Sequence, residues 1–142
     1  DKFDHVFKFG SDYALNHSEL NWHKGLKDIL KGNQIDVIFE HVGVATWDIS
    51  MRTLGRGGRI VTCGATTGYD VNIDLRHLFS KQQSILGSTM SDMDTFKKVQ
   101  DKIQNGIYVP FVDRVYPLAD IRHAHSQIEN RKNIGKVVLS ID

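Results

Sequence analysis

Apolar residues recur every three or four positions in six stretches of the chain, and most of these stretches end at glycine or asparagine. This spacing predicts amphipathic helices. Ser18, Asp74 and Ser91 stand where helix N-caps are expected, and Ser91 with Asp94 resembles a capping box. The apolar stripes are Phe3, Val6 and Phe7; Trp22, Leu26, Ile29 and Leu30; Val44, Trp47, Met51 and Leu54; Leu75, Leu78 and Phe79; Met93, Phe96, Val99 and Ile103; and Ile121, Ala124 and Ile128.

Short apolar runs lie between these stripes and predict strands. The alternation of strand and helix indicates an α/β fold, an incomplete doubly wound (Rossmann-type) parallel sheet with helices on both faces. Two shorter extended pieces are expected at 109–112 and 114–116. The predicted strands are residues 13–16, 35–40, 60–63, 84–88 and 136–141.

The stretch from Gly57 to Gly68 is the strongest candidate for a binding site. Gly57 and Gly58 predict a turn into a strand buried on both faces, and Gly64 lets the chain leave that strand with unusual dihedral angles. Ligands of open α/β sheets bind outside the carboxyl ends of the strands. Gly64, Ala65 and Thr66 are therefore candidate ligand contacts, and a tight strand exit without a ligand is the alternative.

Composition and charge exclude several classes of protein. The 142 residues carry a net charge of +1 with both signs spread along the chain, which does not favour a nucleic-acid partner. The sequence has no long apolar run, so we expect no membrane association and a cytoplasmic protein. The single Cys63 excludes an internal disulfide, and its strand position predicts a small buried residue rather than a nucleophile.

No residue stands out as a catalytic group or metal ligand. His123 and His125 are two positions apart on a predicted helix and point in different directions. His41 deserves notice because it follows a predicted strand. The sequence also lacks a G-x-G-x-x-G loop, since Gly55 to Gly58 precede a strand and are interpreted as a turn.

Six segments together resemble the carboxyl-terminal part of the medium-chain dehydrogenase/reductase superfamily. The resemblance is closest to zinc-containing alcohol dehydrogenases and quinone oxidoreductases, and it covers essentially the whole chain in order. The segments that carry it are Phe9–Asn16, Asp36–Gly43, Gly57–Gly68, Ser84–Met90, Tyr116–Leu118 and Gly135–Leu139.

The resemblance implies which residues contact a nicotinamide cofactor, either NAD or NADP. Backbone groups at three strand ends would contact the nicotinamide half, and Lys136 would approach the cofactor's phosphates. The implied strand-end contacts are Val42, Gly43, Gly64, Ala65, Leu86, Gly87 and Ser88.

The resemblance also implies how the chain is organised and what lies outside it. Residues 1–105 would be the carboxyl-terminal part of the dinucleotide-binding domain, and residues 106–142 would return to the catalytic domain. The phosphate loop, the residue that selects NAD or NADP, and the ligands of any zinc in the parent protein would lie upstream of Asp1. A homodimer would form through the strand from Ser84 to Met90.

The function implied is hydride transfer between the nicotinamide and a small-molecule alcohol, aldehyde or activated alkene, with the fragment alone expected to be inactive. A non-catalytic, oxidoreductase-like structural or binding protein is the alternative. A doubly wound methyltransferase would share the sheet but not the six segments.

Overall fold

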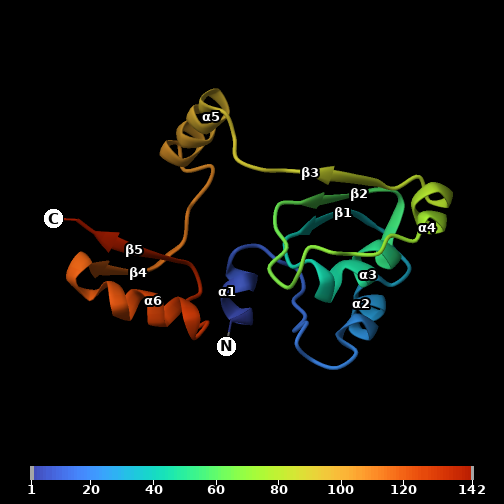
Figure 1. Cartoon of the computed structure of the whole chain (residues 1–142), viewed down its shortest axis with the longest axis horizontal. Helices are drawn as coiled ribbons and strands as arrows, with labels where there is room; N and C mark the ends of the chain where they lie inside the picture. The colour runs from blue at the N-terminus through green and yellow to red at the C-terminus, as the bar shows by residue number, and fades with distance from the viewer. Residues whose placement is uncertain (1, 142) are drawn as a thin grey trace. The chain divides into compact units, whose positions relative to one another are not determined.

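The computed structural model describes residues 2–141, which form two compact units (Figure 1). One unit comprises residues 13–90, and the other comprises residues up to Asp12 together with those from Ser91 onward. In chain order the elements are α1 (Phe3–Lys8), α2 (Trp22–Leu30), β1 (Ile35–Glu40), α3 (Val44–Thr53), β2 (Leu54–Thr62), α4 (Leu75–Ser80), β3 (Ser84–Gly87), α5 (Met93–Gln104), β4 (Val112–Pro117), the 3-10 turn η1 (Leu118–Asp120), α6 (Ile121–Glu129) and β5 (Lys136–Ser140).

A parallel sheet of order β1-β2-β3 forms the centre of the unit spanning residues 13–90 (Figure 1). Ile38, Ile60 and Ile85 lie opposite one another on adjacent strands. Because they share a face, they form one apolar row, against which Trp47 and Met51 of α3 pack. Ile60 is completely buried, so this row is the core of the unit.

The opposite face of the same sheet is open. Phe39, Val61 and Leu86 are aligned across the three strands in the same way. Phe39 is 66% exposed and Leu86 is 46% exposed. Within the described residues, therefore, the sheet has one covered face and one apolar face in contact with solvent.

The carboxyl end of α3 is held by residues that follow α4. The Lys81 ammonium donates to the carbonyls of Arg52 and Leu54, at 2.8 and 3.1 Å. The Gln83 amide donates to those of Met51 and Leu54, at 3.2 and 2.9 Å. These donors satisfy carbonyl groups that have no partner within the helix, and a cation at this end complements the helix dipole.

The second unit contains a β-α-β arrangement. Strands β4 and β5 pair in parallel, and α6 connects them and packs on them through the buried Ala124. This matches the amphipathic helix and final strand that the sequence predicts for this region. Phe9, just after α1, makes an edge-to-face contact with Phe111 at 4.9 Å between ring centroids.

Most of the predicted elements are confirmed, and the exceptions have physical reasons. Residues 13–16 form no strand, because no described strand pairs with them. Helix α2 begins at Trp22 without a side-chain cap, so Ser18 does not cap it. Helix α5 is capped by Asp92, which accepts from the Thr95 amide at 2.7 Å, instead of by Ser91.

The predicted turn at Gly55 to Gly58 is also wrong. These residues belong to β2, which starts at Leu54. The pairing of β1 with β2 is interrupted there: Ile35 faces Leu54, whereas Val37 faces Arg59. Extra residues in one strand of a pair form a bulge, and glycine is common at such positions. Gly57, with φ of +71°, supplies the backbone conformation that the bulge needs.

The α/β fold expected from the sequence is confirmed: parallel strands in small sheets are flanked by helices. Helices were expected on both faces, but among the described residues one face of the sheet β1-β2-β3 is open. The predicted boundary between residues 105 and 106 stays a prediction. Residues 2–141 contain no helix with the length and apolarity that a membrane span requires.

Candidate functional site

The carboxyl ends of β1, β2 and β3 lie at one edge of the sheet. Glu40, Thr62 and Gly87 are in register across the three strands. The Cys63 amide donates to the Glu40 carbonyl at 3.1 Å, and the Ser88 amide donates to the Thr62 carbonyl at 2.8 Å. The structure therefore brings together the predicted strand-end residues, which are Val42, Gly43, Gly64, Ala65, Leu86, Gly87 and Ser88.

Two loops at this edge are hydrogen-bonded to each other. The turn 41–43 follows β1, and the loop 64–68 follows β2. The Thr67 amide and hydroxyl both donate to the Val42 carbonyl, at 2.8 and 2.7 Å. The Thr66 amide donates to the His41 carbonyl at 3.3 Å. These hydrogen bonds hold the two loops in fixed positions relative to each other.

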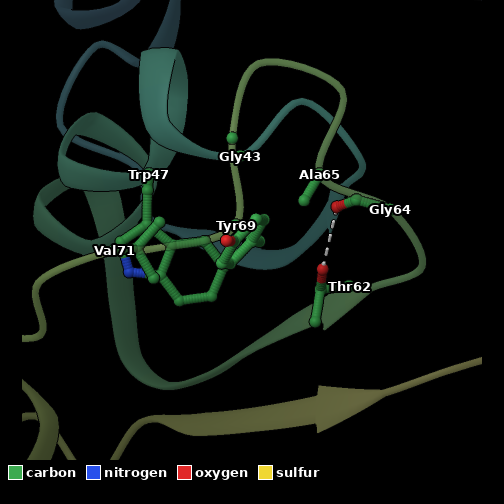
Figure 2. A pocket seen from close by; sticks show the side chains of 8 residues that line it. Gly43, Trp47, Thr62, Gly64, Ala65, Tyr69 and Val71 are labelled. Carbon is green, nitrogen blue, oxygen red and sulfur yellow. Dashed lines mark hydrogen bonds between the residues drawn. The ribbon is translucent and has the colours of Figure 1, made fainter.

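Gly43 is required where the two loops cross. Its φ of 89° and ψ of −132° belong to a region of backbone space open essentially only to glycine. A Cβ atom at this position would overlap the Gly68 carbonyl oxygen and would lie 3.2 Å from the Ala65 Cα. Figure 2 shows Gly43 and Ala65 on their neighbouring loops. The close approach at Gly43 is therefore made by the protein's own backbone.

Glu40, the last residue of β1, is a buried carboxylate that lies beside the start of α3. Its side chain accepts from the Val42 and Gly43 amides at 2.7 and 3.2 Å. It also accepts from the Thr46 and Ser50 hydroxyls, both at 2.9 Å. Burial raises the pKa of Glu40, but these four donors outweigh burial and hold its pKa below the ordinary value. An ionised carboxylate at a helix N-terminus also complements the helix dipole.

A cavity of about 150 Å³ lies beside the loop 64–68 (Figure 2). Thr62 lies on the same face of β2 as Ile60, which faces α3, so the cavity is on the covered side of the sheet. Its volume is far below that of a dinucleotide. Its lining residues are Gly43, Trp47, Thr62, Gly64, Ala65, Gly68, Tyr69 and Val71.

Gly87 differs from the other glycines at this edge. It has no positive φ, and a Cβ atom at this position would meet no heavy atom within 4 Å. Neither backbone conformation nor packing within the chain therefore requires glycine here. The open space beside Gly87 is where a flat ligand can approach the strand ends, and this observation fits the cofactor contact implied by the sequence.

The remaining candidate residues are spread over the chain. Lys136 begins β5 and belongs to the second unit, so its role stays a prediction. Cys63 was expected to be buried, but it follows the end of β2 and is exposed, so that prediction is wrong. Among residues 2–141, no three His, Cys, Asp or Glu side chains lie close enough together to hold a metal ion.

Sequence reasoning missed Glu40 and its hydroxyl partners as organisers of this edge. One signal was available, since Thr46 and Ser50 are four residues apart on a predicted helix and must share a face. In the structure this polar side of the helix faces Glu40, at the end of the preceding strand. The sequence alone does not show which group the two hydroxyls bind, because that depends on how the strand and the helix pack.

Comparisons with known proteins place this geometry in a family. The sequence profile of the zinc-binding dehydrogenases matches residues 3–139. A crotonyl-CoA carboxylase/reductase from Cereibacter sphaeroides is 30% identical over 120 residues, which cover 83% of this chain and 28% of that protein.

Solved structures agree with this placement. The cobalt- and zinc-bound thermostable alcohol dehydrogenase from Pyrobaculum aerophilum aligns with a TM-score of 0.79 and 34% identity, over 98% of this chain and 40% of that one. A 2-octenoyl-CoA carboxylase reductase in complex with NADP and 2-octenoyl-CoA aligns with a TM-score of 0.84 and 28% identity, over 94% and 34%. This chain thus spans less than half the length of each of these relatives. With a profile that matches nearly the whole sequence and a fold that follows it, the chain belongs to the zinc-binding dehydrogenase family.

Proposed function

We propose that this chain is the cofactor-binding part of an NAD(P)-dependent dehydrogenase or reductase. The protein would transfer a hydride between the nicotinamide and an alcohol, aldehyde or activated alkene. The observation that carries the proposal is the open space at Gly87 beside three converging strand ends. This is the position where open α/β sheets bind ligands.

The residues of this chain would bind and orient the cofactor. When bound, the nicotinamide ring supplies or accepts the hydride. The backbone at the ends of β1, β2 and β3 would contact the ring and its ribose, and Gly87 would leave room for the flat ring. The hydrogen bonds between turn 41–43 and loop 64–68 would keep these groups in place without reorganisation on binding.

The relatives support both halves of the proposed chemistry. One solved neighbour is a carboxylase reductase in complex with NADP and 2-octenoyl-CoA, and another is an alcohol dehydrogenase. The first acts on an activated alkene and the second on an alcohol. We propose that the substrate here is a small molecule from one of these two classes.

Other proposals follow from the same resemblance. Residues 106–142 would belong with the catalytic domain, and Lys136 would approach the cofactor's phosphates. A homodimer would form through the strand from Ser84 to Met90. The position of β3 at the edge of its sheet supports this, since edge strands offer unpaired backbone groups to a second copy. We also propose a cytoplasmic location.

Gly87→Val tests the proposed site in the complete protein that carries this chain. Valine is favoured in strands, and its Cβ meets no neighbour within the chain, so the folded state should keep its melting temperature. Its side chain fills the space proposed for the nicotinamide. We expect affinity for NADH or NADPH, measured by fluorescence quenching and calorimetry, to fall by about tenfold or more.

Ser84→Val is the matched control, since it adds a valine at the amino-terminal end of the same strand, far from the converging loops. It should leave cofactor affinity unchanged. Equal affinity of the Gly87→Val variant and the wild-type protein would overturn the site. Absence of any nicotinamide binding or turnover in the wild-type protein would overturn the proposed function and favour a non-catalytic role.

A further inference from the structure

We propose that Glu40 is a positioning residue for the cofactor. Its carboxylate fixes the backbone of turn 41–43 and, through that turn, loop 64–68. This inference rests on the proposed function, because it assigns a task toward the nicotinamide that the strand ends would bind.

The two oxygens of Glu40 have different partners. Oε1 accepts from the Val42 amide at 2.7 Å and from the Gly43 amide at 3.2 Å, so it holds the turn. Oε2 accepts from the Ser50 hydroxyl at 2.9 Å, so it holds the helix. The Thr46 hydroxyl lies within hydrogen-bond distance of both oxygens, at 3.0 and 2.9 Å. Glu40 is only 3% exposed, and no competing water is expected to replace these bonds.

The effect of Glu40 extends to the second loop through the carbonyls of the turn. A peptide unit is planar, so fixing the Val42 and Gly43 amides also fixes the His41 and Val42 carbonyls. The Val42 carbonyl accepts from the amide and the hydroxyl of Thr67. The Thr67 hydroxyl in turn accepts from the Ala45 amide at 3.1 Å. One buried carboxylate therefore fixes the backbone of turn 41–43 directly and that of loop 64–68 through the turn.

This arrangement separates two roles that usually coincide. Joining the end of β1 to the side chains of α3 stabilises the fold, and holding the turn fixes the backbone that the proposed cofactor would contact. Ser50 contributes only to the first role, because it contacts Oε2 on the helix side. Thr67 contributes to the second, because it joins the turn to loop 64–68, and also to the first, because its hydroxyl accepts from the Ala45 amide of α3. Both substitutions should therefore lower the melting temperature, and only the one at Thr67 should also weaken cofactor binding.

The experiment compares four variants of the complete protein with the wild type. Glu40→Ala removes the acceptor. Glu40→Gln keeps an acceptor for the two amides, and its own amide can donate to the two hydroxyls. Thr67→Val breaks the link to the second loop, and Ser50→Ala is the control. For each we measure the melting temperature, the Kd for NADH and NADPH, and KM and kcat.

We expect Glu40→Ala to weaken cofactor binding by about tenfold or more, and Glu40→Gln to restore affinity to within about threefold of the wild type. Thr67→Val should raise the cofactor Kd by about 3- to 10-fold. Ser50→Ala should lower the melting temperature and leave the Kd unchanged. Should Glu40→Ala fail to fold, the contrast between Thr67→Val and Ser50→Ala decides the question.

If the variants have lower melting temperatures but all keep the wild-type Kd, the positioning role is overturned and a purely structural role remains. The same holds if Glu40→Gln fails to restore affinity although it folds as well as the wild type. A wild-type protein that binds no nicotinamide would instead overturn the proposed function itself, and the positioning role with it.

Discussion

At the scale of single residues, glycines near the sheet edge serve opposite purposes. Gly43 is glycine because of its own chain: its positive φ and the nearby Gly68 carbonyl exclude a side chain. Gly87 has neither constraint. The requirement at Gly43 is therefore structural, whereas the chain itself imposes none at Gly87, where only the proposed cofactor would. Two substitutions of the same kind should have different consequences.

Gly43→Ala should destabilise the folded state by about 2–4 kcal/mol, the combined cost of a strained backbone and an overpacked contact. Gly87→Ala should change the free energy of unfolding by less than about 0.5 kcal/mol or increase it slightly, since alanine restricts the unfolded chain. Urea unfolding followed by circular dichroism measures both. Similar free energies for the two variants would contradict the geometry at Gly43.

At the scale of elements, the short helix α4 depends on a local charge pair at its start. Asp74 caps α4, accepting from the Arg76 amide at 3.0 Å, and the Arg76 guanidinium donates to both of its carboxylate oxygens. These hydrogen bonds from Arg76, first from its side chain and then from its backbone, lower the pKa of Asp74 to about 2. The cap therefore stays ionised through the ordinary range of pH.

This low pKa gives a pH prediction with a definite sign. A carboxyl group whose pKa is lower in the folded state stabilises that state above its unfolded pKa, and the contribution is lost as the pH falls through the folded pKa. We expect the contribution of the Asp74 cap to the stability of α4 to be lost between about pH 4 and pH 2. Carbon-detected titration of the Asp74 carboxyl measures this.

Arg76→Met provides the control, since it removes the guanidinium and leaves the Arg76 amide position in place. The pKa of Asp74 should then rise toward its ordinary value, and the contribution of the cap to α4 should be lost at higher pH. An unchanged titration curve in this variant would show that Arg76 does not cause the shift.

At the scale of the whole molecule, little of the apolar surface is buried. The core cluster of the unit spanning residues 13–90 consists of Trp47, Met51, Leu54 and Ile60. The open face of the sheet carries Phe39, and α4 carries Phe79, which is 71% exposed. Exposed apolar patches of this kind mark interaction surfaces, and a net charge of only +1 opposes association weakly.

The 142-residue chain by itself should therefore self-associate as its concentration rises. Sedimentation velocity should show growing species, and sulfate should strengthen the association because it strengthens apolar burial. Phe39→Lys should weaken association by placing a charge on the open face. Leu20→Lys, at a residue that is 93% exposed and lies outside the sheet, is the matched control. A monomer at every concentration would contradict the prediction.

The sequence analysis succeeded where apolar runs are bounded by clear stop signals. The strand from Ile35 to Glu40 is followed by Gly43, and the strand from Ser84 ends at Gly87, so both were found within a residue of their observed ends. Because ligands of open α/β sheets bind outside the carboxyl ends of the strands, the pattern indicated the exit from β2 at Gly64, whereas the contacts at the other two strand ends came from the family resemblance. Their role toward a cofactor stays a prediction.

The failures have a common cause, which is that burial and pairing depend on partners distant in sequence. Tyr13 to Asn16 has a strand-like composition, but no described strand pairs with it. Cys63 follows an apolar run, yet β2 ends before it and leaves it exposed. The hydrogen bonds of Glu40 require the end of β1 and the first turns of α3 to be assembled.

The two ends of α3 also differ in how early they can be completed during folding. Glu40, at the amino end, binds Thr46 and Ser50, which are close to it in the chain. Lys81, at the carboxyl end, reaches Arg52 and Leu54 only after the chain has passed through β2 and α4. Local contacts form before those that close long loops. The helix should therefore consolidate from its amino end, so that the contacts of Glu40 with α3 form before the carboxyl end of the helix is fixed by Lys81.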